Sequence, residues 1–292
     1  MIKAKAKPKK LSLLWGKIGM IAVVILTLFP LISFLKLPFD FFNNDRRKLI
    51  NNPEFIVRNI DTTGKAKLFE EPLITLTFDD GRETVYSQAF PLLAKYGIHT
   101  TQYLLSGSIN DQSYLSYAQI KQMYESGHEI GCHTVGHLDI TTLSDKDLEH
   151  ELSQCKKTFE KFGPVTDFAS PYGHADDRSL SIVEKYYTTH RNTSGDITNT
   201  VTEDDVNLAE TFDRYNIMSV AIRKDTTIEQ LQEAIDFIST NNGWLVLAYH
   251  QIEDDNNATF GLDPKSLNSQ LEFISNAPIK IATMQEALKL GI

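Results

Sequence analysis

The sequence is poor in cysteine, with only Cys132 and Cys155 among 292 residues. Two thiols form at most one bridge, so the chain is not a small scaffold built on disulfides. Because free cysteine is among the most buried residue types, we expect two buried thiols, with a single bridge as the alternative. Charged residues make up 23% and hydrophobic residues 41%, which is ordinary for a globular protein with a substantial core.

Acidic residues are absent from the first 36 positions, which hold seven lysines and no arginine or histidine. The net charge of the chain is -9, so the remaining residues carry a net charge of -16. An acidic domain repels a phosphate backbone. We therefore expect no nucleic-acid partner, and a neutral or cationic substrate fits the charge better.

No charge interrupts the stretch from Ile18 to Leu35, which is about long enough to span a bilayer. Lys17 and Lys36 flank it and can reach the two interfaces. The chain after it lacks the small-residue cleavage site that ends a signal peptide. We expect an uncleaved transmembrane signal anchor at residues 18–36, with a cleaved signal peptide as the alternative. The positive-inside rule then puts the N-terminus, a basic segment at 1–17, in the cytoplasm and the rest outside.

Residues 37–71 show no clear hydrophobic period and are expected to form a stalk or lead-in before one domain at 72–292. In that domain, short β-rich runs alternate with amphipathic helical stretches, which predicts parallel strands joined by right-handed crossovers. About seven such units predict an α/β fold, an irregular (β/α) barrel of about seven strands, with its chemistry at the carboxyl ends of the strands. The expected strands are 73–78, 98–105, 128–132, 165–170 and 244–249, and the expected helices are 85–96, 117–126 and 144–161, with others that begin near 227, 263 and 283.

Two adjacent acids end the first expected strand, in the run Phe78-Asp79-Asp80-Gly81. Neighbouring carboxylates repel each other, and a bound cation would allow both to stay ionised. Asp80 is then a candidate metal ligand and Asp79 a candidate base. A turn without chemistry is the alternative, because Asp-Asp-Gly is common in loops.

Two histidines follow the third expected strand, in the run His133-Thr134-Val135-Gly136-His137. Histidines four positions apart can meet on one side of a turn and share a metal. With one carboxylate, they leave coordination positions open for water and substrate, as in a catalytic site. Two unrelated surface histidines are the alternative, but their place directly after a strand favours metal ligands.

Two weaker motifs end later strands. In Pro171-Tyr172-Gly173, the glycine lets the backbone approach a ligand closely, and the Tyr172 N–H is a candidate donor to an oxyanion. An ordinary β-turn is the alternative. In Leu247-Ala248-Tyr249-His250, the histidine is placed to act as a general acid, with a histidine at the edge of the core as the alternative.

In their order and approximate spacing, these motifs resemble the polysaccharide deacetylase family, carbohydrate esterase family 4, from about Leu73 to the C-terminus. The resemblance implies a divalent metal, usually zinc, and hydrolysis of an acetamide. Water attacks the acetyl carbonyl, and the leaving amine is protonated to give free glucosamine and acetate. The implied site residues are Asp79 as base, His250 as acid, the Tyr172 N–H at the oxyanion, Asp80, His133 and His137 as metal ligands, and Pro171 and Gly173 at the substrate.

The chain departs from the family pattern at Ala169, where many members have an arginine that orients the base. A second arginine is also missing near Tyr215-Asn216-Ile217. The run from Phe168 to Gly173 looks more like the exopolysaccharide deacetylase branch, which acts on the poly-N-acetylglucosamine of biofilms.

We therefore expect metal-dependent N-deacetylation of an N-acetylglucosamine-containing polysaccharide outside the membrane, with poly-N-acetylglucosamine and peptidoglycan as the main candidates. One alternative is a catalytically inactive, carbohydrate-binding relative that acts as a surface scaffold, which the missing arginine favours. Another is an O-acetyl esterase on a different cell-surface glycan. All five side chains implied as base, acid or metal ligand are present, which favours an enzyme. They are Asp79, Asp80, His133, His137 and His250.

Overall fold

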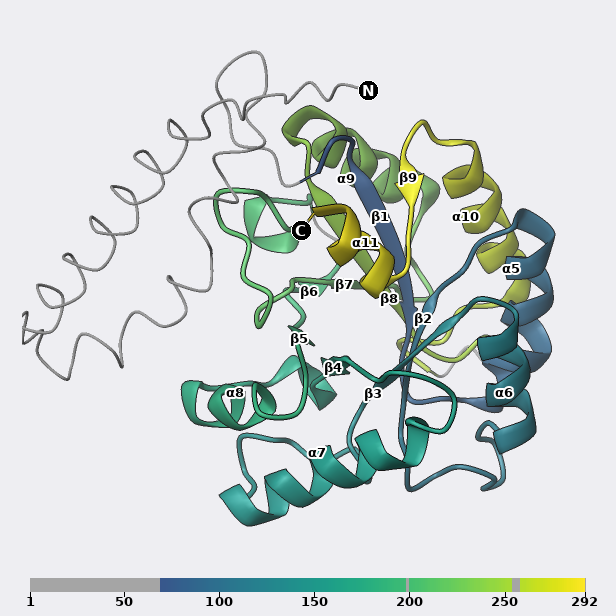
Figure 1. Ribbon diagram of the computed structural model, residues 1–292. Helices are drawn as coiled ribbons and strands as arrows, with labels where there is room; N and C mark the ends of the chain where they lie inside the picture. Colours follow the sequence, from purple (N-terminus) through teal and green to yellow (C-terminus); the bar gives the residue numbers. More distant parts are fainter. Residues whose placement is uncertain (1–68, 198–199, 254–257, 292) are drawn as a thin grey trace, which may run out of the picture. The chain divides into compact units, whose positions relative to one another are not determined.

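A curved sheet of short parallel strands forms the centre of the computed structural model (Figure 1). The structure describes residues 69–197, 200–253 and 258–291, all of them in one compact unit, Asn51–Ile292. The predicted membrane anchor at 18–36 lies outside these residues. None of the described helices is long and apolar enough to cross a bilayer.

The strands follow the order β5-β4-β3-β2-β1-β8-β7-β6, with β9 beside the first residues of β1, and every pair is parallel. Within the described ranges, the strands are β1 (Leu73–Phe78), β2 (Thr101–Leu104), β3 (Glu129–Cys132), β4 (Asp167–Ala169), β5 (Thr189–Arg191), β6 (Gly195–Asp196), β7 (Val220–Ala221), β8 (Trp244–Tyr249) and β9 (Lys280–Ile281).

The two ends of this order lie on one run of chain, because only residues 192–194 separate β5 from β6. Backbone N–H groups along this run donate to carbonyls of residues 214–221, for example from His190 to Arg214 at 2.9 Å and from Ser194 to Ser219 at 3.0 Å. The sheet therefore curls round on itself. The predicted α/β fold of parallel strands is confirmed. The strand count differs from about seven because β5 and β6 are two pieces of one run and β9 adds a two-residue strand.

The helices surround the sheet (Figure 1). Several begin at the caps that the sequence predicts: the Thr227 hydroxyl accepts the N–H of Gln230, and Asp263 caps the helix that starts with Pro264. The helical segments are η2 (a π-helix, Val85–Ala89), α5 (Phe90–Tyr96), α6 (Tyr117–Glu125), α7 (Asp145–Phe159), η3 (a 3₁₀ turn, Pro171–Gly173), α8 (Asp177–Val183), η4 (a 3₁₀ turn, Glu203–Asp205), α9 (Ile228–Asn241), α10 (Pro264–Asn276) and α11 (Met284–Gly291).

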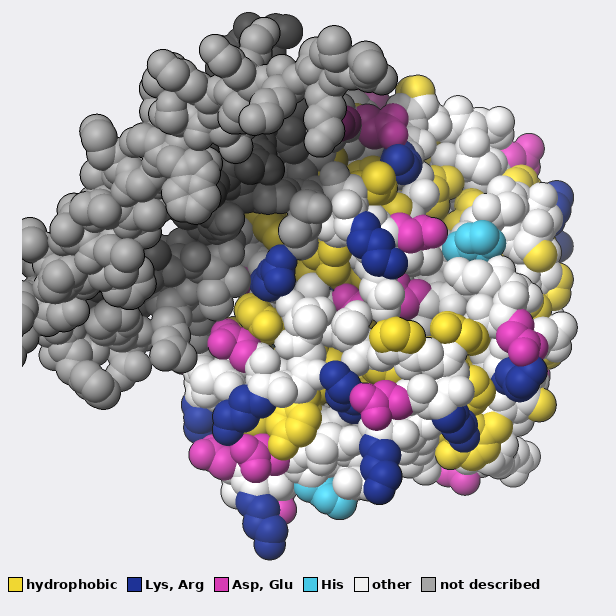
Figure 2. All heavy atoms as spheres, in the orientation of Figure 1, with side chains coloured by type: hydrophobic (Ala, Val, Ile, Leu, Met, Phe, Trp, Pro, Cys, Tyr) yellow, Lys and Arg dark blue, Asp and Glu magenta, His cyan; other side chains and the backbone are white. Residues whose placement is uncertain are grey.

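The core has an outer and an inner part, because alternate residues of a strand point to opposite faces of the sheet. In β1, Ile74, Leu76 and Phe78 belong to the larger hydrophobic cluster, which also contains the buried faces of the surrounding helices. Leu73 belongs to a smaller cluster with Trp244 and with side chains of α11. On the face shown in Figure 2, acidic and basic side chains are interspersed on the outer surface.

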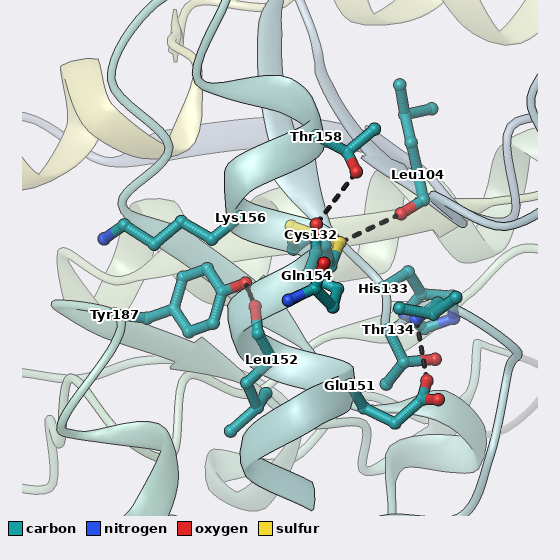
Figure 3. The surroundings of a disulfide bond; sticks show 12 residues. Leu104, Cys132, His133, Thr134, Glu151, Leu152, Gln154, Lys156, Thr158 and Tyr187 are labelled. Carbon is teal, nitrogen blue, oxygen red and sulfur yellow. Dashed lines mark hydrogen bonds between the residues drawn. A yellow bond between two sulfur atoms is a disulfide. The ribbon is translucent and has the colours of Figure 1, made fainter.

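Cys132 and Cys155 form a disulfide bond, so the expectation of two buried thiols is wrong (Figure 3). Cys132 is the last residue of β3 and Cys155 lies on α7, with 6.0 Å between their Cα atoms. This separation is within the range for a bridge. The pairing could not be seen in the sequence because it depends on how the buried face of α7 lies against β3. The bond attaches α7 to the strand that leads directly into His133.

Candidate active site

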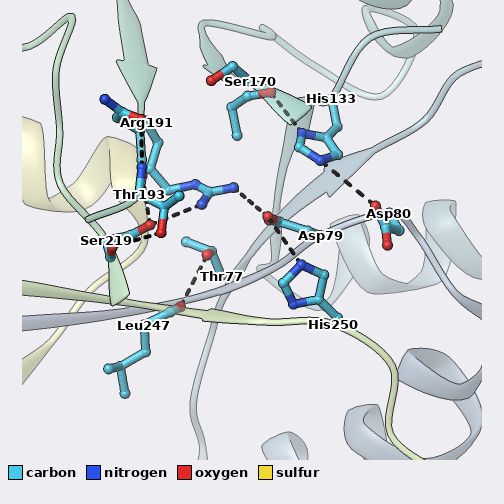
Figure 4. Close-up of polar contacts among 12 residues, drawn as sticks. Thr77, Asp79, Asp80, His133, Ser170, Arg191, Thr193, Ser219, Leu247 and His250 are labelled. Atoms are coloured by element: carbon cyan, nitrogen blue, oxygen red, sulfur yellow. Dashed lines mark hydrogen bonds and ion pairs between the residues drawn. The ribbon is translucent and has the colours of Figure 1, made fainter. Parts of the chain in front are cut away.

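The predicted base, acid and metal ligands lie together at the carboxyl ends of neighbouring strands (Figure 4). Asp79 and Asp80 follow β1, His133 follows β3, and His250 follows β8. β8 pairs directly with β1, and β2 alone separates β1 from β3. Because all these strands are parallel, their ends open at the same edge of the sheet, as in other sheets of this kind.

Asp80, His133 and His137 place one ligand atom each within 4.8 Å of the others. The Asp80 Oδ1 atom lies 3.3 Å from His137 Nε2 and 3.8 Å from His133 Nε2. This oxygen is buried and has no hydrogen-bond partner among the described residues. Two imidazoles and one carboxylate at these separations fit a divalent metal and leave further coordination positions open.

The two histidines are held by groups outside the cluster. His133 Nδ1 donates to the Ala169 carbonyl at 2.7 Å, which directs Nε2 toward Asp80. Burial lowers the pKa of His133, which favours the neutral imidazole that a metal requires. Glu151 on α7 accepts the N–H groups of Val135 and Gly136 at 2.8 and 3.0 Å. The loop between the histidines is therefore fixed to the helix that the disulfide attaches to β3.

Backbone strain is concentrated at this site. Asp80, Thr134, His137 and Tyr172 have φ values of 70°, 72°, 57° and 61°. They are four of the seven non-glycine residues with positive φ in the described ranges. Such conformations are uncommon for residues with a Cβ atom, and they persist where the surrounding structure enforces a required geometry.

Asp79 forms a buried ion pair with Arg191, the last residue of β5. The Arg191 Nη2 atom lies 2.5 Å from Asp79 Oδ2, and the two side chains are 4% and 5% exposed. Nη1 donates to the Ser219 hydroxyl at 3.0 Å. Burial alone would raise the pKa of Asp79, but the charges of Arg191, His133 and His250 outweigh it and lower this pKa. Asp79 is thus a carboxylate whose Oδ2 is paired, while its buried Oδ1 has no hydrogen-bond partner among the described residues.

Arg191 is a site residue that the sequence analysis missed. The family pattern places an arginine at the position of Ala169 on β4. Here the guanidinium comes from the next strand, at the residue that pairs with Ala169 in the β4–β5 register. The only part of the sequence that could have indicated this strand is the short run Thr189-His190-Arg191. Three residues are too few to show a hydrophobic periodicity.

His250 lies near Asp79, and Tyr172 packs against His137. His250 Nε2 is 4.0 Å from Asp79 Oδ2, and its Nδ1 has no hydrogen-bond partner in the described part of the chain. Tyr172 is 60% exposed, and its ring packs edge-on against His137, with 4.7 Å between ring centroids. Gly173 follows with φ 69°, and a Cβ atom there would lie 2.1 Å from the Thr193 side chain, so the turn requires glycine.

A cavity of about 350 Å³ brings these residues together, a volume typical of a small-molecule site. Pro171, one of the two residues predicted at the substrate, is buried and is not among those that line the cavity, whereas Gly173 is. The lining residues are Asp79, Asp80, His133, His137, Ser170, Tyr172, Gly173, Arg191, Thr193, Gly195, Asp196, Ala221, Ala248, His250 and Phe260.

Residues 66–190, which include both acids and both cluster histidines, match the family model for polysaccharide deacetylase. Through this segment, which is less than half of its length, the chain is related to the polysaccharide deacetylase family. It is 36% identical to a peptidoglycan-N-acetylglucosamine deacetylase of Bacillus cereus over 110 residues, 37% of this chain and 49% of that protein. It is 27% identical to a poly-β-1,6-N-acetyl-D-glucosamine N-deacetylase of Staphylococcus aureus over 139 residues, 41% of this chain and 47% of that protein.

The fold of this chain is also found in a solved structure. A family 4 acetyl xylan esterase from Clostridium thermocellum, in complex with a cobalt ion, superposes with a TM-score of 0.52 at 20% identity. The superposition covers 75% of this chain and 91% of the esterase, and it shows a shared fold. The matched segments span less than half the length of the curated relatives.

Proposed function

We propose that this protein removes acetyl groups from an N-acetylglucosamine-containing polysaccharide by metal-dependent hydrolysis. The observation that carries the proposal is one cavity lined by the cluster Asp80, His133 and His137 together with Asp79 and His250. This arrangement provides a metal site, a carboxylate base and an imidazole acid within reach of one acetamide group. The two deacetylases to which the chain is similar support this class of reaction.

The cluster would hold a divalent metal, for which we propose zinc because two imidazoles and a carboxylate suit that ion. When bound, the ion lowers the pKa of a water molecule and polarises an acetyl carbonyl. His133 contributes Nε2 in the tautomer that its hydrogen bond to Ala169 sets. Asp80 Oδ1, which has no hydrogen-bond partner among the described residues, would contribute the carboxylate oxygen.

The chain's own groups move the protons. Asp79 accepts a proton from the attacking water through Oδ1, while Arg191 fixes Oδ2 and thereby the direction of the carboxylate. The Tyr172 N–H, which we assign to the oxyanion, is oriented by the left-handed turn at that residue. A new C–O bond forms, the C–N bond breaks, and His250 protonates the leaving nitrogen, which yields acetate and a free amine.

We further propose that the domain, residues 72–292, acts outside the cell membrane. In this proposal residues 18–36 are the anchor, 1–17 lie in the cytoplasm and 37–71 are the lead-in. The uncharged run at Ile18–Leu35 supports the anchor. The disulfide between Cys132 and Cys155 supports an oxidising compartment, because such bonds are rare in the cytosol.

Poly-N-acetylglucosamine is the substrate that we propose, with peptidoglycan as the alternative polymer. The sequence run from Phe168 to Gly173 supports the exopolysaccharide. The scaffold alternative depended on a missing arginine, and Arg191 now contacts Asp79 in its place. The contact to the base that was missing in the sequence is therefore present, which supports an enzyme.

The test is acetate release by the purified protein from oligomers of both polymers and from an O-acetylated glycan. Each substrate is assayed with the protein as purified, with the protein after treatment with a chelator, and with the chelated protein after zinc is added back. We expect release that chelation abolishes and zinc restores, strongest on poly-N-acetylglucosamine. Zinc-loaded protein that releases no acetate from any of the three substrates would contradict the proposed function.

A further inference from the structure

A buried aromatic ring lies on the face of the arginine that pairs with the proposed base. The Cζ atom of Arg191 is 5.1 Å from the centre of the Tyr103 ring, on β2, within the range of a cation–π contact. Tyr103 is fully buried, and the Arg191 side chain is 4% exposed. Such a contact is strongest where water is excluded. The guanidinium therefore contacts Asp79 with one edge and Tyr103 with one face.

The polar contacts of Arg191 do not fix its guanidinium group completely. Nη2 pairs with Asp79, and Nη1 donates to the Ser219 hydroxyl at 3.0 Å (Figure 4). Nε is buried and has no hydrogen-bond partner among the described residues. Contacts at Nη1 and Nη2 alone allow the planar group to tilt about the line that joins these two atoms. A ring packed on its face opposes this tilt, and it adds no charge that would compete with Asp79 for the cation.

The sheet provides the space for this ring. Tyr103 pairs with Gly131 of β3 in the parallel register, and a Cβ atom on Gly131 would lie 2.6 Å from the ring. Glycine at this position therefore leaves the volume that the ring occupies. Burial and the neighbouring carboxyl groups of Asp167 and Glu129 raise the pKa of Tyr103 well above its ordinary value, so the phenol stays neutral. Arg191 thus meets an uncharged ring.

The ring of Tyr103, and not its hydroxyl group, makes the contact with Arg191. The hydroxyl is buried and has no hydrogen-bond partner among the described residues. A buried hydroxyl without a partner adds no stabilising contact. Phenylalanine would keep the ring and remove only the hydroxyl, whereas leucine would keep an apolar side chain and remove the ring. These two substitutions therefore separate the ring from the rest of the side chain.

We propose that Tyr103 is a positioning residue for the proposed base and acts through Arg191. Its ring holds the guanidinium in the plane in which Nη2 meets Asp79 Oδ2, and this fixes the direction of Oδ1, the oxygen that takes the proton. The inference rests on the proposed function, since it gives Asp79 the role of base. Tyr103 does not line the cavity, so its effect should appear in kcat and not in KM.

The test replaces Tyr103 in the full-length protein and measures kcat and KM for acetate release, together with unfolding in denaturant. Tyr103→Phe keeps the ring, and Tyr103→Leu removes it. In a graded series, the introduced ring of Tyr103→Phe carries one, two or three fluorine atoms. Fluorine withdraws electrons from the ring face and so weakens its attraction for a cation, while the size of the ring changes little.

The matched controls are Phe69→Leu and the same fluorinated series at Phe69. Phe69 belongs to the same smaller hydrophobic cluster as Tyr103, and it packs edge-on against Trp244 with 5.7 Å between ring centroids. Among the described residues, no lysine or arginine lies over its ring. These controls change a buried ring of the same cluster without touching Arg191.

We expect Tyr103→Leu to lower kcat about tenfold and Tyr103→Phe to keep it within about twofold, the scale of one buried cation–π contact. KM should change by less than about twofold in both variants. In the fluorinated series at position 103, kcat and the denaturant midpoint of unfolding should both fall stepwise. Phe69→Leu should lower the midpoint but not kcat, and fluorination at Phe69 should give no stepwise loss of kcat.

Three outcomes would overturn the proposal. They are wild-type kcat in Tyr103→Leu, a fluorinated series with constant kcat and constant midpoint, and a series that lowers the midpoint alone. The last would show a ring that stabilises Arg191 without acting on the base. If Tyr103→Leu does not fold, the fluorinated series decides, because it keeps the size of the ring. Absence of acetate release from the wild type would instead contradict the proposed function, and the unfolding series would still show whether the ring attracts Arg191.

Discussion

The two sides of the curled sheet are built differently. On one side, β1 and β8 have six residues each and pair along their whole length, with every residue buried. On the other side, β5, β6 and β7 have three, two and two residues. The long strands are held by ladder hydrogen bonds and apolar burial. The short strands need side chains to hold them in place.

Asn207 is the clearest of these side chains. Its Nδ2 donates to the Met218 carbonyl at 2.9 Å, its Oδ1 accepts the Met218 N–H at 2.9 Å, and its backbone exchanges hydrogen bonds with Trp244 at the start of β8. Ser219 adds a bond from its hydroxyl to the Asn192 carbonyl at 2.8 Å. The site therefore combines the proposed base and acid, which follow long regular strands, with an arginine on a segment that polar side-chain contacts hold in place.

The substitution with the largest expected effect on activity is at Asp79, the proposed base, which follows the long strand β1. Asp79→Asn removes the proton acceptor but keeps the shape of the side chain. We expect kcat/KM for acetate release to fall by about 10² to 10⁴, the usual contribution of a general base. The content of bound divalent metal, measured on the purified variant, should be unchanged because the proposed ligands remain. A variant with wild-type turnover would remove Asp79 from the reaction.

The corresponding substitution on the side of the sheet with short strands is Arg191→Ala, at the end of β5. It leaves the Asp79 carboxylate buried without its partner, which we expect to lower the free energy of unfolding by about 3–5 kcal/mol. It should also raise the pKa of Asp79, so the acidic limb of the pH–activity profile should move to higher pH. Denaturant unfolding and a pH profile measure the two effects.

Lys121→Ala is the control for this variant, since Lys121 pairs with Glu125 at the surface. An exposed ion pair of this kind contributes less than about 1 kcal/mol. Equal losses of stability in the two variants would contradict a special role for the buried pair. Rescue of the pH profile by Arg191→Lys would show that charge at this position matters more than the forked guanidinium.

The disulfide attaches α7 to β3, the strand that leads into the loop of the histidines. Replacing both Cys132 and Cys155 by alanine should lower the free energy of unfolding by about 3 kcal/mol, as expected for a loop of 23 residues. Zinc affinity should fall with it, because Glu151 on α7 holds the loop between the ligands. Thermal unfolding of wild type with and without a reductant checks the same effect. Unchanged melting in both comparisons would contradict it.

Asn207→Ala tests whether side-chain contacts hold the short strands. It leaves the Met218 backbone groups without partners, at an expected cost of about 2 kcal/mol of stability. Activity should fall more than for a substitution of equal cost in an outer helix, because Arg191 pairs with the segment that Asn207 fixes. Ile235→Ala on α9, which should cost at least about 2 kcal/mol, is the comparison. Equal activity in the two variants would argue against this coupling.

The difference between long buried strands and strands of two or three residues also explains which parts of the structure could be predicted from the sequence. β1, β8 and the helices with caps at Thr227 and Asp263 have enough buried residues and cap signals to be located. The motif residues stand at the ends of such elements, so their meeting could be anticipated. Arg191 and Asp196 stand on strands of three and two residues, whose position depends on contacts from distant segments. No local pattern encodes such contacts, and the same holds for the Cys132–Cys155 pairing.

The smallest expected effect concerns pH, at the end of the sheet opposite the catalytic residues. Glu129, at the start of β3, accepts the N–H of Gln285 at 3.0 Å and the Thr101 hydroxyl at 2.9 Å, which docks α11. Burial and the neighbouring Asp167 raise the pKa of Glu129 well above its ordinary value. The folded protein therefore keeps a proton that the unfolded chain loses.

The contribution of Glu129 to the free energy of unfolding is fully present below the ordinary glutamate pKa. It is lost as pH rises toward the raised pKa of the folded protein. The slope is at most about 1.4 kcal/mol per pH unit within that window. Glu129→Gln stays neutral and keeps an oxygen acceptor, so its unfolding free energy should lack this decline while wild type shows it. Denaturant melts of both proteins from pH 4 upward measure the difference. Parallel curves would show that Glu129 ionises in the folded state much as it does in the unfolded chain, and that α11 docks without the proton.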